Sequence, residues 1–135
     1  MRMTRAAAIL FTIVTGGVVL FQLSLAFGAP LGSYAMGGAF PGVFPPAMRF
    51  AALMQALLLV VTQLVVLSRS GILLRRWFRQ SKWAIWLVVV MGLISVVLNS
   101  ITPSAGERAI WSPVAVVLFV CSLTVAITAG KRPPL

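Results

Sequence analysis

The chain of 135 residues is almost without acidic groups and has no histidine. Its one carboxylate side chain is Glu107, and its one cysteine is Cys121. A histidine-based metal or haem site, a carboxylate pair and a nucleophile with an imidazole base are therefore excluded. A single cysteine cannot form an intramolecular disulfide, and within an apolar run it usually acts as a small hydrophobic residue. We expect a protein that is not an enzyme and that holds neither a cofactor nor a metal.

Charges of either sign are scarce, because 9% of the residues are charged, 61% are hydrophobic and the mean hydropathy is +1.08. Too few polar groups remain to coat a soluble domain. Charge-free stretches cover residues 6–48, 50–68, 83–106 and 109–130. Each can hold the roughly 20 apolar residues that cross a bilayer. The sequence predicts an all-α membrane protein, an antiparallel four-helix transmembrane bundle that forms a single domain over residues 1–135, with spans near 6–27, 47–68, 82–101 and 105–129.

The basic residues predict how the bundle sits in the membrane. Nine of the eleven Lys and Arg residues lie before the first span, between the second and third, or after the fourth. Only Arg49 and Arg108 fall on the other side, and short loops rich in Lys and Arg remain in the cytoplasm. We expect both termini to be cytoplasmic in a bacterial plasma membrane. The net charge of +10 does not suggest nucleic acid, because the charges flank apolar spans and suit anionic headgroups.

The connection between the second and third spans has a helical pattern of its own. On a helical wheel its apolar residues share one face and its basic residues the opposite face: Leu73, Leu74, Trp77 and Phe78 against Arg75, Arg76, Arg79 and Lys82. This pattern predicts a short amphipathic helix in the headgroup layer, with Trp77 and Phe78 toward the acyl chains and the basic groups on anionic lipid headgroups. The alternative is that the arginines only determine the topology.

Polar residues are concentrated in the outer half of the predicted bundle. Three amides, a rim of charged groups and two aromatic residues gather there: Gln22, Gln55, Asn99, Arg49, Glu107, Arg108, Tyr34 and Trp111. Ser104 and Glu107 also have the spacing of a helix capping box. One interpretation is structural: the amides tie helices together, and Glu107 caps a helix or pairs with an arginine, preferably Arg49. The other is an outward pocket for a lipid headgroup or amphipathic ligand, in which the arginines contact an anion.

Several short motifs in the outer loops point to a family. These are Gly28-Ala-Pro-Leu-Gly-Ser-Tyr34, Gly37-Gly38, Pro45-Pro-Ala-Met-Arg49, Asn99, Pro103-Ser-Ala-Gly-Glu107-Arg108 and Pro113-Val114. In this combination the chain resembles a group of small bacterial four-span membrane proteins. The resemblance covers both outer loops and most of the chain. It implies the four-span architecture and directs attention to the outer face, but it implies no particular activity.

We therefore expect a small non-enzymatic integral membrane protein that binds a lipid-like or amphipathic ligand, or a partner protein, through its outer face. The alternative is a homo-oligomeric subunit of a small transporter or channel. A proton- or cation-coupled exporter would need a charged group in the middle of a span, and the charge-free interiors of the spans contain none. A pore should show a polar axis along the bundle, whereas a binding protein should be closed at its inner end.

Overall fold

The computed structural model describes residues 2–131, and this part of the chain is all-helical, without strands. Its long helices are α1 (Arg2–Ala26), α2 (Pro46–Arg69), α3 (Ser81–Ile101) and α4 (Ala105–Thr128). Three single turns of 3-10 helix lie between them: η1 (Gly32–Tyr34), η2 (Met36–Gly38) and η3 (Arg75–Trp77). All four long helices are long and apolar enough to cross a membrane. The four predicted long apolar helices are confirmed, with ends that agree to within four residues.

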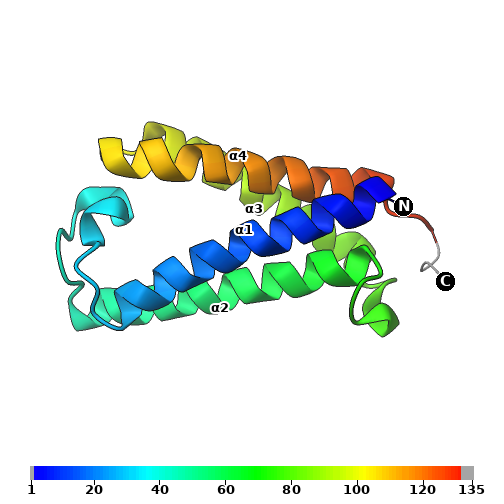
Figure 1. The fold of residues 1–135 in the computed structure, drawn as a ribbon, viewed down its shortest axis with the longest axis horizontal. Helices are drawn as coiled ribbons and strands as arrows, with labels where there is room; N and C mark the ends of the chain where they lie inside the picture. Colours follow the sequence, from blue (N-terminus) through cyan, green and yellow to red (C-terminus); the bar gives the residue numbers. More distant parts are fainter. Residues whose placement is uncertain (1, 132–135) are drawn as a thin grey trace.

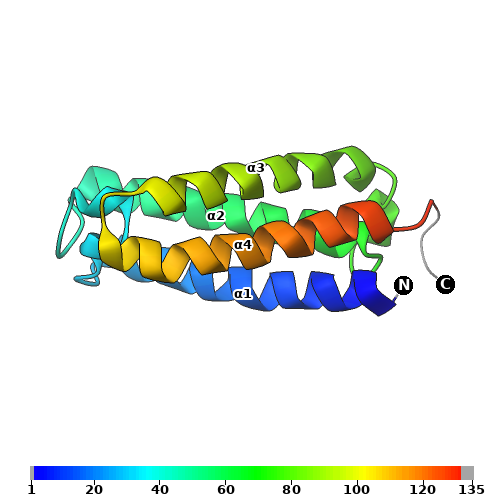
Figure 2. The ribbon, with the colours of Figure 1, turned by 90° about the horizontal axis from the view of Figure 1, so that it is seen from above.

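The four helices lie side by side along their length (Figures 1 and 2). The start of α1, the end of α4 and the connector, residues 70–80, lie at one end of the bundle, which we name the connector end. A hydrogen bond of 2.7 Å between the hydroxyl groups of Thr4 and Thr128 joins α1 to α4 there. Residues 27–45 lie at the opposite end, named the loop end. Figure 1 shows α1 and α2 separating from α3 and α4 toward the loop end.

The buried apolar side chains form two clusters. The cluster toward the connector end draws on all four long helices and contains Ala8, Phe11, Val66, Ile85, Val88, Cys121 and Val125. The cluster at the loop end contains Leu25, Ala35, Phe44 and Ala52, so here the loop itself packs on α1 and α2. Burying these side chains removes apolar surface from water and fixes the loop in place. The loop is therefore part of the packed structure and not a free linker.

The path of the loop depends on Gly32. Its amide donates to the carbonyl of Gly42 over 2.9 Å, which draws the two arms of the loop together. A Cβ atom on residue 32 would lie only 1.9 Å from the carbonyl oxygen of Phe40. Only glycine therefore allows this crossing. The chain then enters α2 at Pro46, whose missing amide hydrogen needs no partner in the first turn of a helix.

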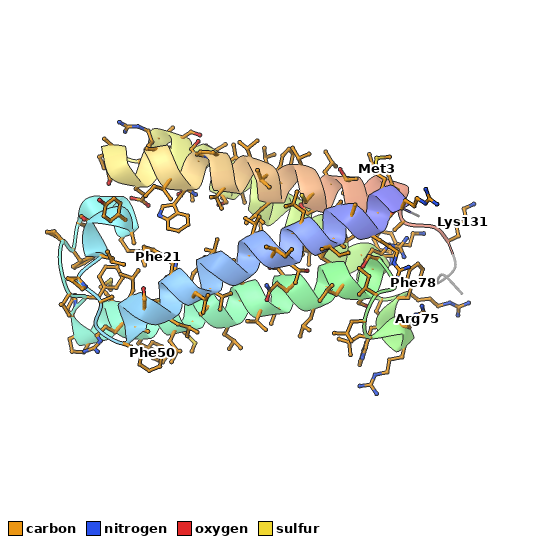
Figure 3. All side chains as sticks on the ribbon, viewed as in Figure 1. Met3, Phe21, Phe50, Arg75, Phe78 and Lys131 are labelled. Carbon is orange, nitrogen blue, oxygen red and sulfur yellow. The ribbon has the colours of Figure 1, made fainter. Side chains whose placement is uncertain are left out.

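The connector differs from the predicted amphipathic helix. Its only helical segment is the three-residue turn η3, and Leu74 before it has a left-handed φ of 51°. Trp77 is about half exposed, but Phe78 is 2% exposed and its ring lies 4.5 Å from the guanidinium carbon of Arg69. The prediction that Phe78 faces the acyl chains is wrong, because Arg69 of α2 packs on that ring from inside the protein. Figure 3 shows Arg75 extending away from the ribbon at this end.

Candidate functional site

A cavity of about 470 Å³ lies between the two helix pairs toward the loop end. All four long helices and the loop contribute to its wall, which ends at Tyr34, Asn99 and Glu107 on the loop side. The cavity forms where α1 and α2 separate from α3 and α4 (Figure 1). Its volume falls within the range of roughly 300 to 1,000 Å³ that is usual for pockets of small ligands.

Six of the eight predicted site residues line this cavity. They come from every long helix and from the loop: Gln22, Tyr34, Gln55, Asn99, Glu107 and Trp111. The other two, Arg49 and Arg108, are not part of its wall. The structure therefore brings the predicted amides, aromatic residues and acid together, but it leaves the arginines outside.

Glu107 connects the cavity wall to the loop. Its Oε2 accepts a hydrogen bond of 2.9 Å from the amide of Gly37 and one of 3.0 Å from the hydroxyl of Thr102. Its own amide donates to the Ser104 hydroxyl over 3.2 Å, so the helix cap at Ser104 is confirmed. The carboxylate does not complete the capping box, because it binds the loop instead of the Ser104 amide. Among residues 2–131 its Oε1 accepts no hydrogen bond, so one carboxylate oxygen has no protein partner.

The two outer arginines bind backbone carbonyls. Arg49 donates from Nε to the Ala26 carbonyl over 2.8 Å, and Arg108 donates to the Thr102 carbonyl. Carbonyls at a helix C-terminus have no partner within the helix, so Arg49 caps the end of α1. The predicted ion pair between Arg49 and Glu107 is wrong. In the described part of the chain no lysine or arginine nitrogen lies within 4.0 Å of the Glu107 carboxylate.

Two further side chains of α4 and its cap fasten the loop over the cavity. Ser104 donates to the carbonyl of Ser33 over 2.9 Å, and the Trp111 indole donates to the carbonyl of Tyr34 over 2.8 Å. The Tyr34 ring packs on the backbone of α4, since a Cβ on Gly106 would lie 2.8 Å from its Cε1. The loop that begins at the end of α1 is thus held by α4, on the other side of the cavity.

The three amides in the cluster do not tie the helices together. The Asn99 amide donates only within α3, to the carbonyl and hydroxyl of Ser95 at 2.8 and 3.1 Å. The side chains of Gln22 and Gln55 make no hydrogen bond to any described residue. An interhelical amide bond does exist, but it comes from Gln63, which donates to the Thr12 carbonyl over 2.9 Å. The predicted structural role therefore belongs to a residue outside the predicted cluster.

The cavity is polar at the loop end and apolar farther in. Phe21 of α1 and Trp111 of α4 both line it, and their rings are in contact, with 4.6 Å between the centroids. Phe21 was not predicted as a site residue, since one phenylalanine in an apolar helix carries no signal. One turn or more farther from the loop end the lining is aliphatic or thioether: Val18, Leu59, Met91 and Leu118. The arrangement suits a molecule with a polar head and an apolar tail.

A buried arginine holds the connector end, and sequence reasoning missed it. Arg69 is 5% exposed, and its guanidinium donates to the carbonyl of Phe78 over 3.2 Å and to that of Gly130 over 3.0 Å. Its Nε has no hydrogen-bond partner among the described residues. In the sequence Arg69 belongs to the basic residues that indicate the topology, and its two serine neighbours alone distinguish it from the exposed arginines 75, 76 and 79.

The predicted membrane-surface residues lie at the connector end. Arg75, Arg76, Arg79 and Lys82 are all exposed. Two of them extend over neighbouring indole rings: Arg76 lies 5.7 Å from the ring centroid of Trp77, and Lys82 lies 5.8 Å from that of Trp83. Cationic and indole groups side by side are typical of a protein surface in the headgroup layer.

No protein-family model, curated protein or solved structure matches the chain. Residues 2–131 also contain no group of three or more His, Cys, Asp or Glu side chains that could hold a metal ion. The function must therefore be argued from the loop-end cavity itself.

Proposed function

We propose that this chain is an antiparallel four-span protein of a bacterial plasma membrane with both termini in the cytoplasm. The structure supports this topology, because the start of α1, the connector with Arg75, and Lys131 lie at the same end of the bundle (Figure 3). Of the basic residues between 2 and 131, only Arg49 and Arg108 lie toward the loop end, and both bind carbonyls there. A reporter that is active only in the cytoplasm should work when fused to the C-terminus; activity of a periplasmic reporter alone would contradict the topology.

We infer that the protein binds a lipid-like or amphipathic ligand in the loop-end cavity and catalyses no reaction. The observation that carries this inference is the gradient inside the cavity, from Glu107 and the amides to an apolar interior. The unpartnered amides of Gln22 and Gln55 offer donors and acceptors to a ligand head. The cavity lies at the loop end of the bundle. In the proposed topology this end faces the exterior of the cell, so the ligand binds on that side.

Transport is the alternative, through a homo-oligomer that forms a small transporter or channel. A path through one bundle would have to cross the connector end. There Phe11, Ile85 and Val125 are at most 3% exposed and pack in a common apolar cluster, so the end is closed. This closure supports a binding protein, whether its partner is a lipid-like ligand or the exposed part of another membrane protein.

At the connector end we propose contact with anionic lipid headgroups through Arg75, Arg76, Arg79 and Lys82. The exposure of these residues and the half-exposed ring of Trp77 support this placement. Tryptophan quenching by lipids labelled at different depths should place Trp77 near the headgroup boundary.

Mass spectrometry of the intact protein tests cavity binding. Ser95 lines the cavity, and Ser95→Phe would fill part of it. Val97 lies on the same helix and is half exposed outside the cavity, so Val97→Phe is the matched control. We expect protein extracted gently from bacterial membranes, and its Val97→Phe variant, to carry an amphipathic molecule that Ser95→Phe lacks. The same bound species on both variants, or none on the wild type, would contradict the proposal.

A further inference from the structure

We propose that the ligand of the loop-end cavity is an amphipathic cation, with a protonated amine or guanidinium head at Glu107 and an apolar tail toward Leu59 and Met91. This inference rests on the proposed function and specifies its ligand class. It replaces the anionic headgroup that the sequence suggested.

The first argument is the charge in the cavity wall. Glu107 is the only acid in a chain of net charge +10, and among residues 2–131 it is the only charged residue that lines the cavity. Its Oε2 is occupied by Gly37 and Thr102, whereas Oε1 has no partner among residues 2–131. A carboxylate oxygen in such a site forms its strongest hydrogen bond with a cationic donor. The attraction is larger here than in bulk water, because protein atoms around the partly buried carboxylate screen charge less than water does.

The second argument is the position of the arginines. An anionic head would need one of them, and Arg49 and Arg108 were the candidates. Both donate to backbone carbonyls, those of Ala26 and Thr102, and neither lines the cavity. An anion would therefore meet the Glu107 carboxylate without a cation to balance it, and repulsion between like charges disfavours that arrangement.

The third argument is the aromatic wall. Phe21, Tyr34 and Trp111 line the polar part of the cavity together with Glu107. Aromatic faces attract cations within roughly 6 Å of the ring centroid, and tryptophan does so best. The Trp111 indole is fixed by its bond to the Tyr34 carbonyl and by its contact with Phe21. The oxygens of Gln22 and Gln55 can accept further N–H groups of the ligand.

Three probes with the same decyl chain test the head group: decylammonium, decanol and decyl sulfate, each brominated on the chain. The protein is placed in nanodiscs of zwitterionic phosphatidylcholine, with Trp77, Trp83 and Trp86 replaced by Phe. Trp111 then reports contact, since a bromine atom nearby quenches its fluorescence. We expect saturable quenching by decylammonium at a concentration at least about tenfold lower than by decanol or decyl sulfate, because an ionic hydrogen bond is gained.

Substitutions at Glu107 assign that preference to the carboxylate. Glu107→Gln keeps an acceptor for the loop but removes the charge, so decylammonium and decanol should then bind about equally. Ala39→Lys adds the same unit of positive charge on the exposed loop outside the cavity, and it should retain the preference. Glu107→Asp keeps the negative charge and should retain most of the preference for decylammonium over decanol. Preference for the cation that persists in Glu107→Gln would overturn the inference.

The possible failures can be distinguished. Binding that is lost in Ser95→Phe but shows no preference for the cation, or favours decyl sulfate, overturns the cationic ligand and leaves cavity binding intact. Quenching that does not saturate for any probe, or that is the same in Ser95→Phe and Val97→Phe, overturns the proposed function as well.

Discussion

The backbone amide of Gly37 lies 2.9 Å from Oε2 of Glu107, a hydrogen bond between residues 70 positions apart in the chain. Gly37 has a φ of 67°, a conformation that glycine adopts without strain. The only acid of the protein therefore has two roles, since its Oε2 binds the loop and the residue also lines the cavity. A change in the loop must alter the position of the charge in the cavity.

The absence of an Arg49–Glu107 pair leads to a prediction about additivity. Glu107→Ala removes the acceptor for Gly37 and Thr102, and we expect the free energy of unfolding to fall by about 2 kcal/mol. Arg49→Gln should cost about 1 kcal/mol, because it uncaps α1. The two losses should add in the double variant, since the side chains share no bond. Titration with sodium dodecyl sulfate in mixed micelles measures the free energy of unfolding of the two single variants and the double variant. A loss in the double variant that is much smaller than the sum of the single losses would show that Arg49 and Glu107 do interact.

Two glycines of the loop separate steric crowding from backbone strain. Gly32→Ala places a Cβ 1.9 Å from the Phe40 carbonyl oxygen, so the loop must move, at a cost of about 3 kcal/mol. Gly42→Ala meets no atom within 4 Å, but its φ is 79°, and we expect a loss of only about 1 kcal/mol. A protease that cuts exposed loops should cleave Gly32→Ala much faster than Gly42→Ala. Equal cleavage would show that crowding at residue 32 is unimportant.

Arg69 should be far less replaceable than its exposed neighbours. Arg69→Lys keeps a positive charge but cannot bind the carbonyls of Phe78 and Gly130 while stacking on the ring. We expect a loss of about 2 kcal/mol in the free energy of unfolding. Arg79→Lys, on the exposed side of the connector, is the control and should change it by less than about 0.5 kcal/mol. Equal effects would mean that the buried bonds of Arg69 contribute little.

Two threonines of α1 should respond to valine with opposite signs. The Thr15 hydroxyl is buried and has no hydrogen-bond partner within residues 2–131, so Thr15→Val should stabilise the bundle by about 1 kcal/mol. The Thr4 hydroxyl bonds to Thr128, and Thr4→Val should cost about 0.6 kcal/mol. Both values follow from the same micelle titration. A destabilised Thr15→Val would indicate that the hydroxyl has a partner such as bound water.

The helices could be predicted because the signal is local. Charge-free runs bounded by Arg, Lys and Glu determine where a helix can cross a bilayer, and the helix ends agree closely. The residues of the cavity wall were predicted for a related reason. Gln22, Gln55 and Asn99 each lie in the half of their helix nearer the loop end, so all three can line the same cavity.

The partners of the polar groups could not be predicted, because they depend on where separate helix ends meet. An arginine can donate to any carbonyl within reach, and Arg49 donates to the carbonyl of Ala26 instead of to the carboxylate of Glu107. Arg69 likewise reaches Gly130, 61 residues away. The sequence pattern of the connector favours an interfacial helix. In the structure the guanidinium of Arg69 stacks on the Phe78 ring, and this contact holds the ring inside the protein.

The bonds of Arg69 also place a constraint on biosynthesis. The carbonyls of Ala129 and Gly130 follow the last helix, so the ribosome makes them only after all four helices. Until then the guanidinium must stay solvated by water or lipid phosphates at the membrane surface. The two hairpins, α1 with α2 and α3 with α4, can insert one after the other, and the connector end locks only when the later hairpin arrives.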